Sequence, residues 1–582
     1  ITLAHGAFVA REVVRACSSG CLEPSGQQTL QRSQLLASQV APGAVYGYDL
    51  EVHVGCERFL HNRQREEIRQ GLLENNRISL STGQVSLLAA RFIKHLEALH
   101  WKRAPQLAQA MRKDGGYAMH IDATGEDGRG TTLVVYNGWR GWALGAWKLS
   151  TERADLVLPR LRQVAYAFGP PCAIMRDLGR AMIKAARQLV REMEIKIPIL
   201  SCHSHFLRDV GKDLLEAPYD HLRCLVRRHC LRARLRTLAR NLGRGLRLQL
   251  PGLRKDVEFW AKAATGRVLP TGAAGLAIVR SLAQWILDYK RDGHSLGFPF
   301  DYPYLDFYRR CRTVRRAADA FLRQAPGDKR VRRALMSLAR TLDPVIGDKA
   351  FCDIAVKLTR RSALFVRLRQ VLRLSPDKRP KPGAMLSPQR AAAQLQDVRS
   401  AVKRFQQDLR RSHPKRGPAQ DTRQAIDIVL NHLKRHGRSL WGHAIRLPGG
   451  RIRLVDRTNN ALEGFFRGIK HGERRRSGRK VLTYDFERLP AAAALAANLT
   501  RPDYVEILCG SLDHLPQAFM EIDAARRAML RPESKSAQRA AVNEILSSSM
   551  PHADLALIRT SALRDCILAA AQSRAPYVDT GP

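Results

Sequence analysis

Residues 115–215 constrain the fold of this 582-residue chain more than any other stretch. Three runs typical of strands, YAMHIDAT, TTLVVYN and WALGAWKL, follow one another with glycine-bearing connections. A helical run (ERADLVLPRLRQVAYAFG), a short apolar strand (PCAIMRD), a second helical run (GRAMIKAARQLVREM) and a further strand (IPILSCHSHF) come next. Three consecutive strands in a meander, followed by alternating helices and strands, predict an α/β core.

Two acids stand at the ends of predicted strands, and a third lies on a predicted helix. Asp122 belongs to the alternating run that begins at Tyr117, and Asp177 ends an apolar strand just before a helix. Glu463 shares one face of its helix with Arg467 and Lys470, and the apolar Leu462, Phe466 and Ile469 form the opposite face. Each acid alone also has an ordinary explanation, because acids are common in turns, in ion pairs and on solvated helix faces. Together they indicate a metal site built from carboxylates.

The charge of the chain indicates a polyanionic partner. Lys and Arg total 98 and Asp and Glu total 53, which gives a formal net charge of +45. Self-repulsion of that size favours nucleic acid as the partner, ahead of an anionic membrane surface. Membrane insertion is not expected, because the longest apolar run, LPAAAALAANL, is far shorter than the roughly 20 residues that a spanning helix needs.

Residues 62–98 predict two helices joined by a short turn. Ser81 and Gln84 have capping-box spacing at the start of the second helix, where Val85, Leu88, Ala89, Phe92 and Leu96 repeat at helical spacing. In a basic chain this pattern predicts a helix-turn-helix DNA-binding element over 61–112. An ordinary helical hairpin explains the pattern equally well.

The first 60 residues contain half of a candidate zinc site. Cys17 and Cys21 form a C-x3-C pair, and His5 lies upstream. A structural zinc site needs four ligands, and no second pair is evident, so zinc is not the favoured cofactor here. The eleven cysteines have no framework spacing, which suits a reducing compartment.

The acid motifs resemble a known family. The segments HIDATGE, IMRDLG and TNNALEGFFRGIK…RR…GRK are similar to the three acidic motifs of bacterial insertion-sequence transposases of the DDE type. In CHSHF, Cys202 and His205 resemble the C-x2-H signature that follows the second acid in several transposase groups, including the hAT and Mutator-like ones. Their predicted position on a strand near the acids indicates a structural or substrate-positioning role.

The resemblance implies a fold class and a division into domains. The expected fold is an α/β RNase H-like catalytic core with a large all-α insertion, an N-terminal helical DNA-binding region and a C-terminal helical region. The 286 residues between Asp177 and Glu463 accommodate the insertion. The expected domains are an N-terminal region (1–60), the helix-turn-helix (61–112), the first part of the core (113–215), the helical insertion (216–440), the last part of the core (441–487) and the C-terminal helical region (488–582).

The resemblance also implies an activity. Asp122, Asp177 and Glu463 would be the catalytic residues and would bind two Mg²⁺ (or Mn²⁺) ions, which suits oxygen ligands. The expected reaction is cleavage of double-stranded DNA at element ends and transfer to target DNA, by a homodimer or higher oligomer in the bacterial cytoplasm at the nucleoid. The residues expected to contact DNA are Arg467, Lys470, Arg474, Arg475, Arg476, Arg479 and Lys480. The alternatives are an inactive DNA-binding relic and an RNase H-type nuclease.

Overall fold

The chain folds into two compact units. A computed structural model describes residues 1–530, apart from residues 23–27, 29, 32, 128, 247–249, 264–267, 375–384, 448–449 and 451. The terminal unit comprises Ile1–His100 and Leu508–Pro582, and the central unit comprises Trp101–Ile507. The described structure is mostly helical, with a mixed sheet of five strands. The part of the predicted C-terminal helical region beyond residue 530 lies outside the described residues.

Helices form the core of the terminal unit. Its elements are β1 (Arg15–Ala16), β2 (Leu30–Gln31), α1 (Gln34–Gln39), α2 (Tyr48–Phe59), α3 (Arg65–Asn76), α4 (Thr82–Lys102), η5 (Leu512–His514) and α20 (Leu515–Leu530). Apolar residues of α2, α3 and α4 pack together in its interior. On α4, the buried His95 binds Glu51 at 2.5 Å and Asp523 at 3.0 Å. Although burial opposes the charged form, these bonds raise the pKa of His95 to about 9, so that α4 is tied to α2 and α20 by a charged imidazole.

The predicted helix pair of residues 62–98 is present as α3 and α4. The capping box is confirmed, because the Ser81 N–H donates to Gln84 Oε1 at 2.6 Å and the Gln84 N–H donates to Ser81 Oγ at 3.2 Å. The apolar set predicted on the second helix is buried throughout. That helix therefore forms part of the core of its unit, and the DNA-binding role of this element stays a prediction.

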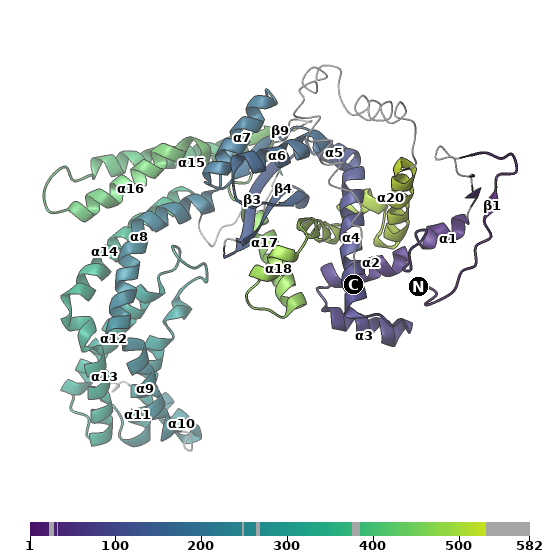
Figure 1. Ribbon diagram of the computed structural model, residues 1–582. Coiled ribbons are helices and arrows are strands. Elements are labelled where there is room, and N and C mark those ends of the chain that lie inside the picture. Colours follow the sequence, from purple (N-terminus) through teal and green to yellow (C-terminus); the bar gives the residue numbers. More distant parts are fainter. Residues whose placement is uncertain are drawn as a thin grey trace. The chain divides into compact units, whose positions relative to one another are not determined.

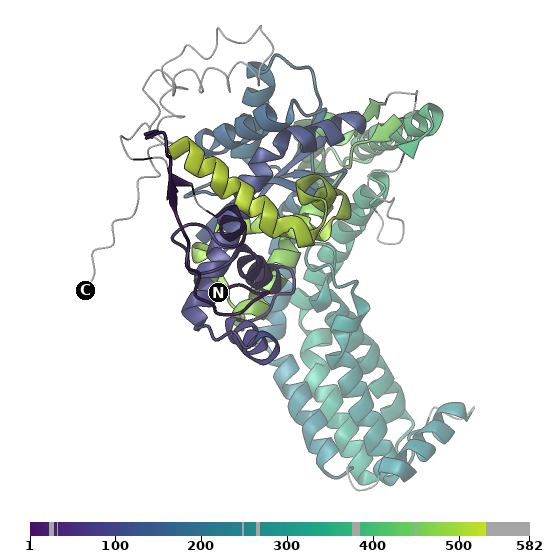
Figure 2. The same ribbon diagram turned by 90° about the vertical axis from the view of Figure 1, so that its right-hand side faces the viewer.

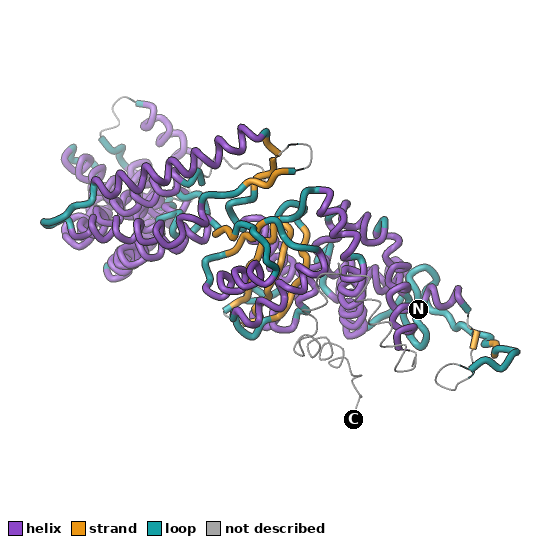
Figure 3. The backbone as a smooth tube through the Cα atoms, turned by 90° about the horizontal axis from the view of Figure 1, so that it is seen from above, coloured by secondary structure: helices purple, strands orange, loops and turns teal. Residues whose placement is uncertain are grey.

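The central unit contains the five-stranded sheet. Its strands are β3 (Ala118–Glu126), β4 (Arg129–Asn137), β5 (Trp142–Lys148), β6 (Ala173–Arg176) and β7 (Ile199–Ser201), in the spatial order β5-β4-β3-β6-β7. The meander β3-β4-β5 is antiparallel, and β6 and β7 run parallel to β3. Figure 3 shows these strands (orange) gathered in one block beside helices (purple). This mixed sheet is compatible with the predicted α/β core.

Helices pack against this sheet and supply its core. The helices α5 (Ala104–Lys113), α6 (Ala154–Phe168) and α7 (Arg180–Glu192) pack in sequence, and α6 and α7 contact the strands. The helices α17 (Asn460–Ser477) and α18 (Thr483–Arg488) contact β3, and η4 (Ala491–Thr500) packs on β5. The helix α17 ends at Gly478, whose left-handed backbone (φ +70°) suits glycine. The last helix of the unit, α19 (Pro502–Cys509), reaches the boundary with the terminal unit.

A long helical insertion separates β7 from the last core elements. It consists of α8 (His203–Arg228), α9 (Leu231–Arg244), α10 (Leu250–Lys262), α11 (Gly272–Leu287), η2 (Tyr289–Asp292), α12 (Pro303–Arg323), α13 (Lys329–Gly347), α14 (Lys349–Val371), α15 (Pro388–Arg411), α16 (Gln420–His436) and η3 (Gly437–Leu440). Figure 1 shows α8 running from the sheet into the bundle of α9, α11, α12 and α13, which lie side by side in Figure 2. No described helix has both the length and the apolar character needed to cross a bilayer.

The insertion is not purely helical, which corrects the prediction for 216–440. The short strand β8 (Met385–Leu386) pairs with β10 (Ile452–Leu454), which also pairs with β9 (Ala444–Arg446). This three-stranded sheet joins the insertion to the chain segment that leads into α17. The sequence pattern missed it because its strands have only two or three residues, too few for a period to be recognised.

Candidate active site

The first two acids lie next to each other on neighbouring strands. Asp122 is on the central strand β3, and Asp177 directly follows β6. The parallel register pairs Ile121 with Arg176, so one further step places Asp177 beside Asp122. Neighbouring strands lie about 5 Å apart, and residues at the same step of a parallel pair share a face of the sheet. The sheet therefore presents both carboxyl groups together, with Asp122 in the middle of β3 and Asp177 just past the end of β6.

Asn459 connects the third acid to the same end of the sheet. It precedes α17, is fully buried, and its side-chain amide donates to the Ile121 carbonyl at 3.1 Å. Its side-chain oxygen lies 3.0 Å from His120 Nδ1 and can accept a hydrogen bond from the Nδ1–H. Its backbone N–H donates to Cys202 Sγ at 3.1 Å. These bonds hold the first turn of α17, and with it Glu463, against the strand that carries Asp122.

Electrostatic interactions link Asp122 to the other acids. Asp122 is 7% exposed. Its burial, and then the negative charges of Asp177, Glu463 and Glu152, raise the pKa of Asp122 to about 8. Burial and Asp177 also raise the pKa of Glu152. Carboxyl groups gathered in this way repel one another when ionised, and a cation would relieve that repulsion.

The spacing of the acids favours metal ions bound jointly by the protein and a substrate over metal ions bound by protein ligands alone. Among the described residues, the group around Glu463 whose ligand atoms all lie within 4.8 Å of one another comprises Cys202, His205 and Glu463, without Asp122 or Asp177. Mg²⁺ keeps several waters and is usually bound through one or two carboxylates plus substrate phosphates. Neighbouring carboxylates that supply only part of the coordination shell therefore suit Mg²⁺.

Cys202 and His205 do lie at the site, but not on a strand. The strand β7 ends at Ser201, Cys202 caps α8, and His205 lies in the first turn of that helix. His205 Nδ1 is 3.8 Å from Glu463 Oε1, and burial lowers the pKa of His205 despite the nearby Glu463 and Asp177. Burial raises the pKa of Cys202 to about 11, so its thiol stays protonated and positions Asn459.

Two further residues belong to the site and were missed in the sequence. Arg208, one turn beyond His205 on α8, binds Glu463 through Nη1–Oε1 at 3.3 Å and Nη2–Oε2 at 2.9 Å. Glu152 lies in the loop between β5 and α6. Its negative charge helps to raise the pKa of Asp122, and the charge of Asp177 helps to raise the pKa of Glu152. Its position in the loop after a predicted strand was the available signal. Arg208 had none, because it lies just beyond the predicted strand IPILSCHSHF, among many other cations of a basic helical region.

No protein-family model matches the chain, and no curated protein matches it. A function for this chain is therefore inferred from its residues and their geometry.

The inner basic residues of α17 bind the protein itself. Lys470 Nζ donates to the Gly125 carbonyl at 2.8 Å and lies 3.9 Å from Glu126 Oε2. Arg474 also approaches Glu126, with 3.6 Å between Nη2 and Oε1. Arg476 is buried and binds Glu473 at 2.7 Å. In this conformation the three cations anchor α17 and the end of β3, and Arg476 is not exposed for contact with phosphate.

The outer basic residues of the same segment face solvent. Arg467, Arg475, Arg479 and Lys480 are exposed, and Arg479 pairs with Asp485 at 3.2 Å. Arg479 itself is about half exposed, whereas Asp485 is largely buried. The predicted role of these residues in DNA binding remains a prediction.

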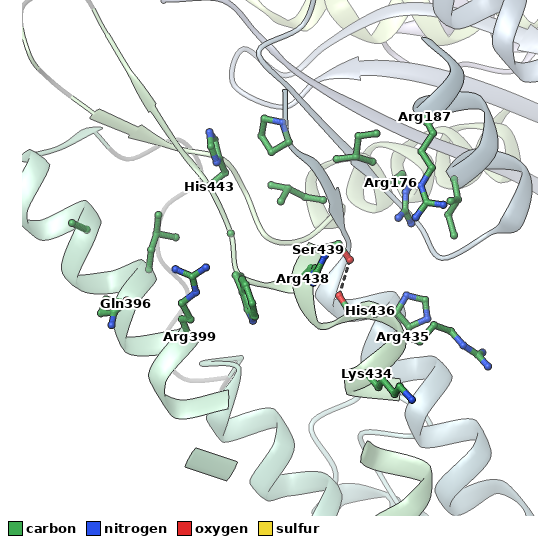
Figure 4. Close-up of a pocket in the computed structure, with 18 residues that line it drawn as sticks. Arg176, Arg187, Gln396, Arg399, Lys434, Arg435, His436, Arg438, Ser439 and His443 are labelled. Atoms are coloured by element: carbon green, nitrogen blue, oxygen red, sulfur yellow. Dashed lines mark hydrogen bonds between the residues drawn. The ribbon is translucent and has the colours of Figure 1, made fainter. Parts of the chain in front are cut away.

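A basic cavity of about 800 Å³ lies on the other side of the Asp177 segment. Its cationic lining residues are Arg176, Arg187, Arg399, Lys434, Arg435 and Arg438, and no Asp or Glu is among the described residues that line it. Figure 4 shows Arg176 and Arg187 facing Arg399 and Gln396 across this cavity. Arg176 is 4% exposed, and its Nε is buried without a hydrogen-bond partner. The lining therefore favours an anion.

The raised pKa of Asp122 predicts that metal binding depends on pH. Below about pH 8 the metal-free Asp122 carboxyl is protonated, and an ion can bind only after the proton leaves. We expect the affinity for Mn²⁺ to fall by about tenfold for each pH unit below 8, with release of a proton. Calorimetric titration between pH 6.5 and 8.5 in two buffers checks this. Asp122→Asn should bind Mn²⁺ weakly and without this pH dependence, whereas a constant wild-type affinity would contradict the assignment.

Proposed function

We propose that the chain is a DDE-type transposase, which cuts DNA at the ends of a mobile element and joins these ends to target DNA. The observation that carries the proposal is the alignment of Asp122 and Asp177 on neighbouring strands, with Glu463 held against β3 by Asn459. The strand order β5-β4-β3-β6-β7, with an antiparallel meander followed by two parallel strands, supports an RNase H-like core. The insertion between the second and third acids agrees with the same proposal.

The reaction depends on how the site residues hold the substrate. Asp122, Asp177 and Glu463 would hold two Mg²⁺ or Mn²⁺ ions, which would supply activation of the attacking hydroxyl and charge stabilisation for the departing oxygen. The Arg208 side chain lies at the same site and is half exposed. It can therefore bind a phosphate when its ion pair with Glu463 breaks. The neutral His205 beside Glu463 can donate a hydrogen bond to a phosphate oxygen without adding charge.

Basic surfaces near the site give double-stranded DNA places to bind. The exposed cations of α17 and the loop that follows it, Arg467, Arg475, Arg479 and Lys480, lie on the helix that carries Glu463. The basic cavity lies beside Arg176, directly next to Asp177 in the chain. Binding through phosphates releases counterions, so affinity for DNA should fall steeply with salt. Assembly on paired ends and a place at the bacterial nucleoid belong to the same proposal.

One assay separates the transposase from its two alternatives. The purified full chain is incubated with duplex DNA carrying an element end, with a target plasmid, in Mg²⁺ or in EDTA. We expect cleaved and joined strands in Mg²⁺ only. Binding of DNA with no cleavage in Mg²⁺ or Mn²⁺ would identify an inactive relic. Cleavage confined to the RNA strand of a labelled RNA–DNA hybrid would identify an RNase H-type nuclease.

A further inference from the structure

Two helices of the insertion bring a second group of metal-ligand side chains together. Asp209 and Asp213 are four residues apart on α8, and His432 and His436 are four residues apart on α16, so each pair shares a helix face. The two helices pack against each other. One ligand atom from each of Asp209, His432 and His436 lies within 4.8 Å of the other two.

The hydrogen bonds of His432 leave one ring nitrogen facing the group. Its Nε2 lies 2.9 Å from Asp213 Oδ2, an arrangement in which Nε2–H donates to the carboxylate. Its Nδ1 is buried, has no hydrogen-bond partner, and lies 3.7 Å from Asp209 Oδ2. Histidines that bind metals usually donate their other ring N–H to a carboxylate, which fixes the tautomer and the ring orientation. Asp213 has that role here.

The surroundings of both imidazoles are apolar on one side. The ring of Phe206 packs edge-on against His432 and His436, whose own rings stack. The His432 side chain is only 6% exposed, whereas Asp209 is about half exposed. A cation could therefore enter past Asp209, and the histidines would hold it with little competition from water.

We propose that Asp209, His432 and His436 bind one divalent cation of the zinc class, with a water molecule as the fourth ligand. Two imidazoles and one carboxylate are a ligand set typical of Zn²⁺, whereas Mg²⁺ prefers oxygen ligands alone. The cation cross-links α8 and α16, the first helix and the last α-helix of the insertion. It lies one helical turn from His205, so it stabilises the point where the insertion leaves the core. The inference does not depend on the proposed function.

Zinc content tests the proposal. The full-length protein and its variants are incubated with ZnCl₂ and dialysed, and the bound zinc is measured by mass spectrometry. We expect His436→Gln and Asp209→Asn each to lower the zinc content by one equivalent. The matched control is His229→Gln, which alters another histidine of the insertion that faces a single aspartate, Asp348, at 3.3 Å. Cys202→Ser serves as a separate arm for zinc bound by Cys202, His205 and Glu463.

Thermal unfolding provides a second readout. Zn²⁺ at about 100 times its Kd should raise the Tm of the wild type and of His229→Gln by about 5 °C, and that of His436→Gln by much less. The ordinary alternative is that His432 bridges the two aspartates without any metal, for which His436 is dispensable. Equal zinc content in His436→Gln and the wild type would overturn the proposal. If His436→Gln fails to fold, the half-exposed Asp209→Asn decides in the same way.

Discussion

Replacement of Asp177 by Asn should abolish DNA cleavage while leaving DNA binding intact. Asn keeps the shape of Asp and can still accept the Gly179 N–H, which donates to Asp177 Oδ1 at 3.0 Å, so the turn before α7 survives. The lost negative charge is the one that a divalent cation needs. We expect single-turnover cleavage of a labelled element end to fall by at least about 10³-fold, with the Kd for DNA within about twofold of the wild type.

The matched control is Asp155→Asn, which makes the same change of charge at an exposed residue in the first turn of α6. Asp155 pairs only with its neighbour Arg153, at 2.9 Å, among the described ion pairs. It should cleave at the wild-type rate. Cleavage by Asp177→Asn within tenfold of the wild type, in Mg²⁺ and in Mn²⁺, would refute the proposed role of this carboxylate.

Replacement of Asn459 by Ala should destabilise the central unit and slow cleavage together. The variant leaves the Ile121 carbonyl and His120 Nδ1 without their partner in a buried place. His120 cannot compensate by ionising, because burial lowers its pKa to about 4. An unsatisfied buried polar group costs about 1–3 kcal/mol, so two should lower the free energy of unfolding by roughly 2–6 kcal/mol. Denaturant unfolding measures this change.

Asn460→Ala is the control, because Asn460 is exposed and its side chain bonds only to Ser204 at 3.0 Å among the described contacts. It should change the free energy of unfolding by less than about 0.5 kcal/mol. Cleavage is compared well below the Tm at saturating DNA, where Asn459→Ala should still be slower because Glu463 is no longer held in place. A destabilised variant with a wild-type cleavage rate would show that Asn459 supports the fold alone.

Much of the core could be predicted from local pattern. The runs around Asp122, Val134 and Ala143 alternate or are continuously apolar, and they form β3, β4 and β5 as expected. The prediction failed at IPILSCHSHF, where a three-residue strand leads at once into a 26-residue helix. The short apolar run before Cys202 does not reveal where the strand ends and the helix begins, because a run of this length is compatible with either structure.

The acids of the candidate site could be predicted from the sequence, whereas the residues that hold them in position could not. The acids stood at recognisable positions, within one strand, directly after another and at the start of an amphipathic helix. Asn459 gave no signal, since its partners His120 and Ile121 are 339 and 338 residues away in the chain. The same applies to the burial of Arg476, which depends on Glu473 and on neighbouring packing rather than on its place in a basic run. Contacts between distant segments decide these roles, and periodicity contains no information about them.

The position of the insertion has a consequence during synthesis on the ribosome. Asp122 and Asp177 leave the ribosome early, whereas Glu463 follows 286 residues after Asp177. At about 5–20 residues per second this delay is roughly 15–60 s. Throughout it, the nascent chain already exposes basic surface but lacks the helix that completes its acid group. If the chain acts on DNA as proposed, a newly made copy is able to bind nearby DNA before it is able to cut it, and a product truncated ahead of α17 would bind DNA without cutting it and compete with intact copies.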